Sequence, residues 1–574
     1  MLDILIKGGE VHDGTGAPAA NADIGIADGV IVEIGRISSP ARQIIDASGA
    51  IVTPGFVDIH SHYDGQVTWG QRMSPSSGHG VTTVVTGNCG VGFAPCRQED
   101  RGRLISLMEG VEDIPEIVMT SGLPWSWETF GEYLDFVGSR KFDVDVGMQL
   151  PHSAMRVYVM GERGASREAA NGQDLASMQR IVVDAMKSGA LGFATSNTLF
   201  HRTSKGEPVP TQGAAERELL AIAEGLREAG HGTMEMLIDV YDDIPGIVEY
   251  MARLEKAAGH GLSFTLAQAG ADAEGWRQIL SCMEDANAKG ARLRGQVIGR
   301  PIGVLLGHAL SYNCFFGCPS YEPLRSLPLS KRMAALRQPE LKARLLAETP
   351  VVSSQPIHAF ARRFDKVFKV SRSIDYEPTA DRSVAAMAAE RGITAEEMAY
   401  DLMLEDDGLA ILYAVVGNYN NGNLDHALEL MEHPDTVLGL GDGGAHYGLI
   451  CDASYTSHML AYWTRDRDRG RMALPEVVRK LTSQTAGVVG LADRGVLKPG
   501  FRADVNVIDY ERMALYAPQV VRDLPAGGQR LIQPVDGYRA TIVNGTTTYQ
   551  NGVATGDLPG RLIRGPQAGP SLAI

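Results

Sequence analysis

Two histidines stand two residues apart in the first part of the chain, immediately after an apolar run. His60 and His62 follow "PGFVDI". If that run is a β-strand, side chains two residues apart point to the same face, so both imidazoles project from one side of its end. Two adjacent imidazoles suit zinc or a similar divalent metal. The pair also fits two solvent-facing loop histidines, and a catalytic metal needs further ligands from elsewhere in the chain.

The middle of the chain alternates eight strand candidates with helical segments. The strand candidates are apolar runs at residues 55–60, 80–90, 143–152, 189–196, 232–239, 261–268, 291–299 and 435–444. Helical patterns separate most of them and end near Gly or a basic residue, as helix C-termini do. This alternation predicts a TIM-type (β/α)8 barrel, whose active site lies at the C-terminal ends of its strands. His60 and His62 would then lie at the mouth of the barrel.

Both ends of the chain have the pattern of short strands broken by turns. Examples are "DILIKGGEVHDG" near the start and "GYRATIVNGTTTYQNG" near the end. We therefore expect a small β-sandwich domain built from both termini, residues 1–54 and 491–574, beside a catalytic barrel at residues 55–490. Two stretches, 92–142 and 300–434, break the alternation and are predicted to be insertions that act as lids or substrate loops.

Composition narrows the class of partner. The 574 residues carry 53 basic and 69 acidic side chains, a net charge of −16, which disfavours nucleic acid or an anionic membrane as a partner. No apolar run approaches the roughly 18 residues that cross a bilayer, and the N-terminus lacks the pattern of a signal peptide. Six scattered cysteines fit a reducing cytoplasm. We expect a cytoplasmic protein that acts on a small molecule, with homo-oligomerisation left open.

Motifs along nearly the whole chain together resemble the amidohydrolase superfamily, and within it the N-acyl-D-amino-acid deacylase (D-aminoacylase) family. They are "PGFVDIHSHYD", "HGVTTVVTGNCGVGFAP", "PHSAMRVYVMG", "GALGFATS", "HPDTVLGLGDGGAH", "LTSQTAGVVGLADRGVLKPGFRADVNVID" and "PGRLIRG". The resemblance implies that His60, His62 and Asp442 bind metal. It also makes Cys89 a ligand, in place of the carboxylated lysine of relatives, and "LGFATS" indeed has no lysine. Taken alone, Asp442 also fits a turn and Cys89 a small buried thiol.

The sequence departs from this family at the fifth and sixth strands, where the family carries metal-binding histidines. "GTMEMLID" and "LSFTLAQ" contain none. Glu235 and Asp239 lie four residues apart, share a face of a regular strand, and are candidate carboxylate ligands. Gln268, near the sixth-strand position, is a poor ligand for zinc. We therefore expect one Zn²⁺ on His60, His62 and Asp442 with Cys89 nearby, and a second ion as the alternative.

Further histidines and arginines near predicted strand ends are candidates for binding substrate. The histidines, each of which also fits ligation or a packed structural role, are His152, His201 and His446. An N-acyl amino acid has a free carboxylate that a bidentate arginine would clamp. The arginines so placed, for which core or surface ion pairs are an equal explanation, are Arg156, Arg202 and Arg300.

The resemblance implies a metal-dependent hydrolase that cleaves the amide bond of an N-acyl amino acid, with a D-amino acid as the expected product. The metal would polarise the carbonyl and supply hydroxide, and Asp442 would carry the proton from water to the leaving amine. The alternatives are a cyclic-amide hydrolase of the hydantoinase type and an amidase for a bulkier substrate. A barrel without metal that serves as a scaffold is a third, and the joint presence of His60, His62, Cys89 and Asp442 argues against it.

Overall fold

The structure is a computed structural model that describes residues 1–239, 243–269, 274–351 and 360–570. Its central sheet has eight parallel strands, each hydrogen-bonded to the next in chain order. They are β6 (Phe56–Asp58), β7 (Val81–Thr86), β8 (Asp145–Pro151), β9 (Gly192–Asn197), β10 (Thr233–Ile238), β11 (Leu262–Thr265), β12 (Leu293–Val297) and β16 (Thr436–Leu438). Beyond the ends of β6 and β16, Ser61 and Gly443 form a parallel bridge. The first and last strands thus meet, and the predicted (β/α)8 barrel is confirmed.

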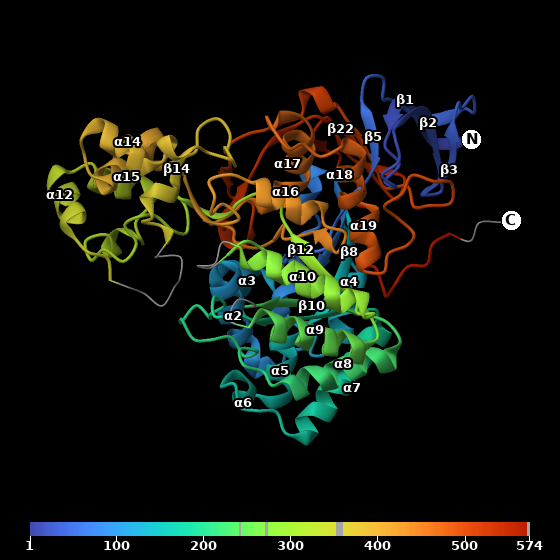
Figure 1. Ribbon diagram of the computed structural model, residues 1–574, viewed down its shortest axis with the longest axis horizontal. Coiled ribbons are helices and arrows are strands. Elements are labelled where there is room, and N and C mark those ends of the chain that lie inside the picture. The colour runs from blue at the N-terminus through green and yellow to red at the C-terminus, as the bar shows by residue number, and fades with distance from the viewer. Residues whose placement is uncertain (240–242, 270–273, 352–359, 571–574) are drawn as a thin grey trace.

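Amphipathic helices cover the outside of the barrel. Four of them connect consecutive strands and pack side by side (Figure 1): α7 (Gly172–Ser188), α8 (Glu216–Ala229), α9 (Ile244–Ala258) and α10 (Gly275–Ala288). The first three end at Gly189, Gly230 and Gly259, each in the left-handed conformation that favours glycine at this position. Their apolar faces and the outward side chains of the strands form the largest hydrophobic core.

The two terminal segments of the chain combine in one mixed sheet beside the barrel (Figure 1). Its strands are β1 (Leu2–Val11), β2 (Ala20–Ala27), β3 (Val30–Gly35), β4 (Ala41–Asp46), β5 (Ile51–Pro54), β17 (Val505–Ile508), β22 (Tyr538–Val543), β23 (Thr546–Gln550) and β24 (Val553–Ala554). β5 pairs with β17, with Val52 opposite Val507, and this pairing joins the two ends of the chain. The predicted terminal β-domain is confirmed, whereas the exact domain limits stay a prediction.

Both predicted insertions carry secondary structure. The first holds α2 (Arg101–Glu112), α3 (Glu116–Gly122) and α4 (Phe130–Gly138). The second holds β13 (Ile302–Leu306), α11 (Leu329–Leu336), α12 (Pro339–Ala347), β14 (Val367–Lys369), α14 (Val384–Arg391), α15 (Ala395–Met403) and β15 (Leu412–Gly417). This second insertion has a hydrophobic core of its own and projects to one side of the barrel, in yellow in Figure 1. It returns to the barrel through α16 (Asp425–Glu432), which precedes β16.

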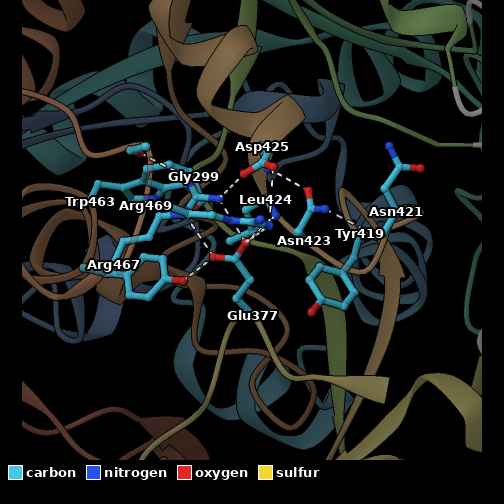
Figure 2. Close-up of polar contacts among 12 residues, drawn as sticks. Gly299, Glu377, Tyr419, Asn421, Asn423, Leu424, Asp425, Trp463, Arg467 and Arg469 are labelled. Atoms are coloured by element: carbon cyan, nitrogen blue, oxygen red, sulfur yellow. Dashed lines mark hydrogen bonds and ion pairs between the residues drawn. The ribbon is translucent and has the colours of Figure 1, made fainter. Parts of the chain in front are cut away.

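A buried arginine anchors this return (Figure 2). The Arg467 guanidinium donates to both carboxylate oxygens of Glu377 at 2.9 Å and to Asp425 at 2.6 Å, and it lies over the Trp463 ring. Glu377 also accepts a hydrogen bond from the backbone of Leu424 at 2.9 Å. Because the Arg467 side chain is 1% exposed, this ion cluster fixes the end of the second insertion against the segment that follows β16.

Short elements complete the chain. They are α1 (Gln66–Trp69), α5 (His152–Met160), α6 (Glu162–Ala165), α17 (Tyr455–Ala461), α18 (Leu474–Leu481), α19 (Ser483–Val488), β18 (Ala514–Leu515), β19 (Gln519–Val521), β20 (Arg530–Ile532) and β21 (Val535–Asp536). Within the described ranges, no helix combines the length and the apolar character that a bilayer crossing requires.

Candidate metal centre

The backbone at the barrel mouth brings the two predicted histidines to the predicted aspartate. His60 and His62 lie just past β6, and Asp442 lies just past β16. The backbone N–H of Asp442 donates to the carbonyl of His60 at 3.1 Å, and that of His62 donates to the carbonyl of Gly443 at 2.7 Å. A Cβ on Gly444 (φ +89°) would lie 2.9 Å from the backbone of His62. Glycine there lets the two strand ends approach, and residues far apart in sequence become neighbours.

Cys89 and Glu235 join the histidines from two other strands. Cys89 lies in the turn after β7, and its Sγ is 3.5 Å from Nε2 of His60. The backbone N–H of Cys89 donates to Glu235 on β10 at 3.0 Å, and the other oxygen of Glu235 lies 4.0 Å from Nδ1 of His60. Single donor atoms of His60, His62 and Cys89 all lie within 4.8 Å of one another. The structure therefore brings the predicted thiol and one predicted fifth-strand carboxylate to the histidine pair.

The distances between donor atoms fit zinc. Oδ1 of Asp442 lies 3.4 Å from Nε2 of His60 and 3.5 Å from Nε2 of His62. Tetrahedral zinc with bonds of about 2.0–2.3 Å separates neighbouring donors by about 3.3–3.8 Å. These two separations, and that between Cys89 and His60, fall in this range. Nitrogen, sulfur and carboxylate oxygen are also the donors that zinc prefers, so the residues fit the implied metal.

Buried acidic groups dominate the electrostatics of this cluster. Burial raises the pKa of the Cys89 thiol well above its usual range, and the charges of Glu235 and Glu112 add to the effect. Burial also raises the pKa of Glu235 to about 7, against the opposing charge of His60. Burial acts in the same direction on Asp442, but its hydrogen bond with His62 and the charge of His60 outweigh it and lower that pKa. A dication would neutralise this excess of acid and stabilise the thiolate.

Three non-glycine residues around the cluster have left-handed backbones. They are Cys89 (φ +55°), Asp442 (φ +48°) and His446 (φ +49°). Such conformations are unfavourable for residues with a Cβ, and they persist where the surrounding structure enforces them, often at functional sites. The strain here coincides with the residues that form or border the cluster.

Two residues that were not predicted from the sequence lie beside the Nδ1 atoms of the two histidines. Gln296 on β12 places Oε1 2.7 Å from Nδ1 of His60. Glu112, the last residue of α2, places Oε1 3.4 Å from Nδ1 of His62. Gln296 was detectable, because it is a polar residue at an inward position near the end of a predicted strand. No spacing pattern in the sequence predicts a role for Glu112, because only the packing of the first insertion brings it to the barrel.

His201 and His446 also lie near the cluster. Nδ1 of His201 lies 2.8 Å from Oγ of Ser196, and Nε2 of His446 lies 3.4 Å from Glu112. Burial lowers the pKa of His201 to about 3, and the charges of His446 and His62 act in the same direction. Burial lowers the pKa of His446 to about 4, although the charge of Asp442 opposes this shift. In both residues burial favours the neutral imidazole. Their substrate-binding role stays a prediction.

The structure places His152 and Arg156 in an internal network. His152 lies 2.9 Å from Glu218 through Nε2 and 2.8 Å from Thr195 through Nδ1. Nε of Arg156 donates to the same Glu218 oxygen at 2.8 Å. Its terminal nitrogens donate to three backbone carbonyls, those of Gly164, Pro210 and Glu168. Both side chains are almost fully buried. These contacts account for the two residues as packing partners of α8, and their predicted role in binding substrate gains no support here.

Arg300 and Asp239 are likewise held by other contacts. Arg300 is fully buried and donates to the hydroxyl of Tyr376 at 3.0 Å and to Asp452 at 3.2 Å. Asp239 lies one residue past the end of β10 and accepts hydrogen bonds from Thr198 at 2.7 Å and from the backbone of Leu199 at 2.9 Å. The structure therefore brings Glu235 to the cluster, whereas Asp239, after β10, is hydrogen-bonded to the loop after β9.

Gln268, near the predicted sixth-strand position, is held by contacts with the second insertion. Oε1 of Gln268 accepts a hydrogen bond from the backbone of Asn420 at 3.0 Å. The backbone carbonyl of Gln268 accepts from the N–H of Asn418 at 2.9 Å, and its N–H donates to the Asn418 side chain at 2.7 Å. Gln268 thus links the barrel to the segment after β15, a role that an amide fulfils through both its backbone and its side chain.

A closed parallel barrel with a His-x-His pair at its first strand and an aspartate at its last has the features of a metal-dependent hydrolase of the amidohydrolase type. A model of the amidohydrolase family matches residues 43–549, and the chain belongs to this family. D-aminoacylase from Alcaligenes xylosoxydans xylosoxydans is 26% identical over 98% of this chain and 97% of its own length. The predicted resemblance is thereby confirmed.

Solved structures of other proteins share the fold. N-acyl-D-glutamate deacylase from Bordetella bronchiseptica, solved with zinc and a phosphonate mimic of the tetrahedral intermediate, has a TM-score of 0.62 and 22% identity, covering 98% of this chain and 99% of that one. L-hydantoinase from Arthrobacter aurescens is more distant, with a TM-score of 0.51 and 14% identity over 98% and 100% of the two chains. The fold therefore lies nearer to the deacylase than to the hydantoinase.

Proposed function

We propose that the protein is a zinc-dependent deacylase that hydrolyses the amide bond of an N-acyl-D-amino acid. The observation that carries this proposal is the convergence of His60, His62 and Cys89 at the barrel mouth, with the Asp442 carboxylate 3.4 Å and 3.5 Å from the two histidines. Similarity to D-aminoacylase along the whole chain supports the choice of an N-acyl-D-amino acid. The hydantoinase alternative has weaker support, because that structure is more distant.

The residues divide the chemistry between them. Zinc, when bound, polarises the amide carbonyl and makes a water molecule acidic. His60 and His62 would hold the ion through Nε2, and Gln296 orients His60 through Nδ1. The Asp442 side chain is 22% exposed, whereas the two histidine side chains are 1–2% exposed, so Asp442 is the member that substrate can reach. Its ionised carboxylate takes the proton from the attacking water and delivers it to the leaving nitrogen.

We propose one ion at full occupancy. The fifth-strand position holds Glu235, whose carboxylate accepts a hydrogen bond from the backbone of Cys89, and the sixth-strand position holds Gln268, whose side chain accepts one from Asn420. A second ion would have Cys89 and Glu235 but no imidazole from these strands. One ion on His60, His62 and Cys89, with Asp442 beside it, has three protein donors and leaves the fourth position of a catalytic zinc site open for water.

Metal analysis and a substrate panel test the proposal. Purified protein is expected to hold about one zinc per chain, and His62→Ala is expected to lose it together with activity. His260→Ala is the matched control, because His260 precedes β11 at the end of the barrel away from the mouth. N-acetyl-D-amino acids are expected to be hydrolysed, and N-acetyl-L-amino acids and hydantoins are not. Zinc-free wild-type protein, or equal turnover of L-substrates, would contradict the proposal.

We also propose that the protein works in a reducing compartment, the cytoplasm. All six cysteines are free thiols in the structure, Cys89 among them, and oxidation of Cys89 would remove a zinc donor. A thiol titration of protein isolated without reductant should find six reactive groups after denaturation. Fewer groups would point to an oxidising compartment.

A further inference from the structure

Glu112 is a buried carboxylate for which the proposed chemistry has so far no use. It ends α2 in the first insertion and is 1% exposed. Neither of its oxygens has a hydrogen-bond partner within the described ranges. Oε1 lies 3.4 Å from Nδ1 of His62, and Oε2 lies 3.4 Å from Nε2 of His446. A carboxylate without hydrogen bonds is costly to bury, so its position between two imidazoles calls for a physical reason.

The backbone around Glu112 is fixed from three sides. The carbonyl of Glu112 accepts a hydrogen bond from the N–H of His446 in the loop after β16. The next residue, Asp113, accepts hydrogen bonds from Ser311 at 2.8 Å and from the backbone of Gly448 at 3.0 Å. Ser311 belongs to the second insertion. The end of α2, the last barrel loop and the second insertion therefore hold the Glu112 carboxylate in one place.

We propose that Glu112 is a positioning residue for the metal centre. This inference rests on the proposed zinc-dependent function. The Glu112 carboxylate faces Nδ1 of His62 at 3.4 Å, and its charge favours the tautomer with the proton on Nδ1 and the ring orientation that presents Nε2 to zinc. Histidines that bind metals generally donate their other ring N–H to a carboxylate or a carbonyl, and this partner raises the basicity of the ligand. Gln296 has the same relation to His60, with Oε1 2.7 Å from Nδ1.

The geometry separates this role from direct ligation. Nδ1 and Nε2 point to different sides of the His62 ring, and Nε2 is the atom that lies 3.5 Å from Asp442. Glu112 contacts the Nδ1 side, so it does not share an ion with Nε2. It follows that the first insertion contributes to zinc affinity as well as covering the barrel mouth.

Zinc affinity measured by chelator competition on the full-length holoenzyme tests this inference. Glu112→Gln keeps the shape and removes the charge, Glu112→Ala removes the contact, and Glu116→Gln is the control, because Glu116 is exposed in the same insertion. We expect Glu112→Gln and Glu112→Ala to bind zinc about 10–100-fold more weakly. We also expect a changed absorption spectrum after cobalt substitution. Glu116→Gln should match the wild type in both measurements.

The outcomes separate this inference from the function on which it rests. If the wild type binds no zinc, the proposed function fails. If the wild type binds zinc and both Glu112 variants bind it equally well with an unchanged cobalt spectrum, only the role of Glu112 is overturned. If the Glu112 variants do not fold, Asp113→Ala decides, because it removes the hydrogen bonds from Ser311 and Gly448 and leaves the Glu112 carboxylate in the chain. Severalfold weaker zinc binding by Asp113→Ala then supports the proposal, and wild-type affinity overturns it.

Discussion

Replacing Asp442 by asparagine separates proton transfer from the assembly of the site. Asparagine has nearly the shape of aspartate, but its amide oxygen does not take up a proton near neutral pH. Oδ1 of Asp442 lies 3.4 Å and 3.5 Å from Nε2 of His60 and His62. The variant therefore preserves the packing at the barrel mouth and removes the base.

The expected loss follows from the role of the group. General acid–base catalysis contributes about 10²–10⁴-fold to the rate. At about 1.36 kcal/mol for each factor of ten, this corresponds to about 2.7–5.4 kcal/mol of transition-state stabilisation. His60, His62 and Cys89 remain as zinc donors in the variant, so bound zinc should fall much less than kcat. KM should change only severalfold.

Steady-state hydrolysis of an N-acetyl-D-amino acid, with zinc measured on the same samples, is the assay. Asp435→Asn is the matched control, because the side chains of Asp435 and Asp442 are 19% and 22% exposed at opposite ends of β16. Asp435 pairs with Arg294 away from the barrel mouth, so its variant should keep kcat. An Asp442→Asn enzyme that holds zinc and retains more than about a tenth of wild-type kcat would refute the assignment of Asp442 as the base.

Two further predictions concern stability. Arg467→Met leaves the carboxylates of Glu377 and Asp425 without their buried cation, and we expect the free energy of unfolding to fall by about 3 kcal/mol in a denaturant titration; an unchanged midpoint would contradict this. Burial raises the pKa of Glu218, but the hydrogen bond and charge of His152 outweigh this effect and help to lower the pKa to about 2. The ionised carboxylate therefore stabilises the fold above its unfolded pKa near 4.5, and this contribution is lost as the pH falls toward 2. The wild type should therefore lose more stability than Glu218→Gln between pH 5 and pH 3, and parallel pH profiles would contradict this.

The sequence was most informative where function depends on strand ends. Each barrel strand is an apolar run, and the C-terminal ends of parallel strands meet at one face, so His60 and His62 could be placed at the barrel mouth without a structure. Asp442 was identified through the family resemblance. Cys89 needed the family resemblance as well, since a cysteine in a glycine-rich turn has no spacing signal of its own. Glu235 followed from the regular alternation of β10.

The remaining residues depend on packing between distant segments, which local patterns do not encode. Asp239 shares a face with Glu235 only if the strand continues, but β10 ends at Ile238 and Asp239 bonds to the loop after β9. Glu112 reaches His62 because α2 packs over the mouth, where Ser106 contacts Ser204 of that same loop. The sequence of the insertion alone does not predict that these two residues are in contact.

Anomalous diffraction from zinc-loaded crystals, recorded on both sides of the zinc absorption edge, tests the central claim most directly. We expect one strong peak per chain within about 2.0–2.3 Å of Nε2 of His60, Nε2 of His62 and Sγ of Cys89, beside Oδ1 of Asp442. A peak bound elsewhere, or the absence of a peak between these atoms in crystals of active enzyme, would contradict it.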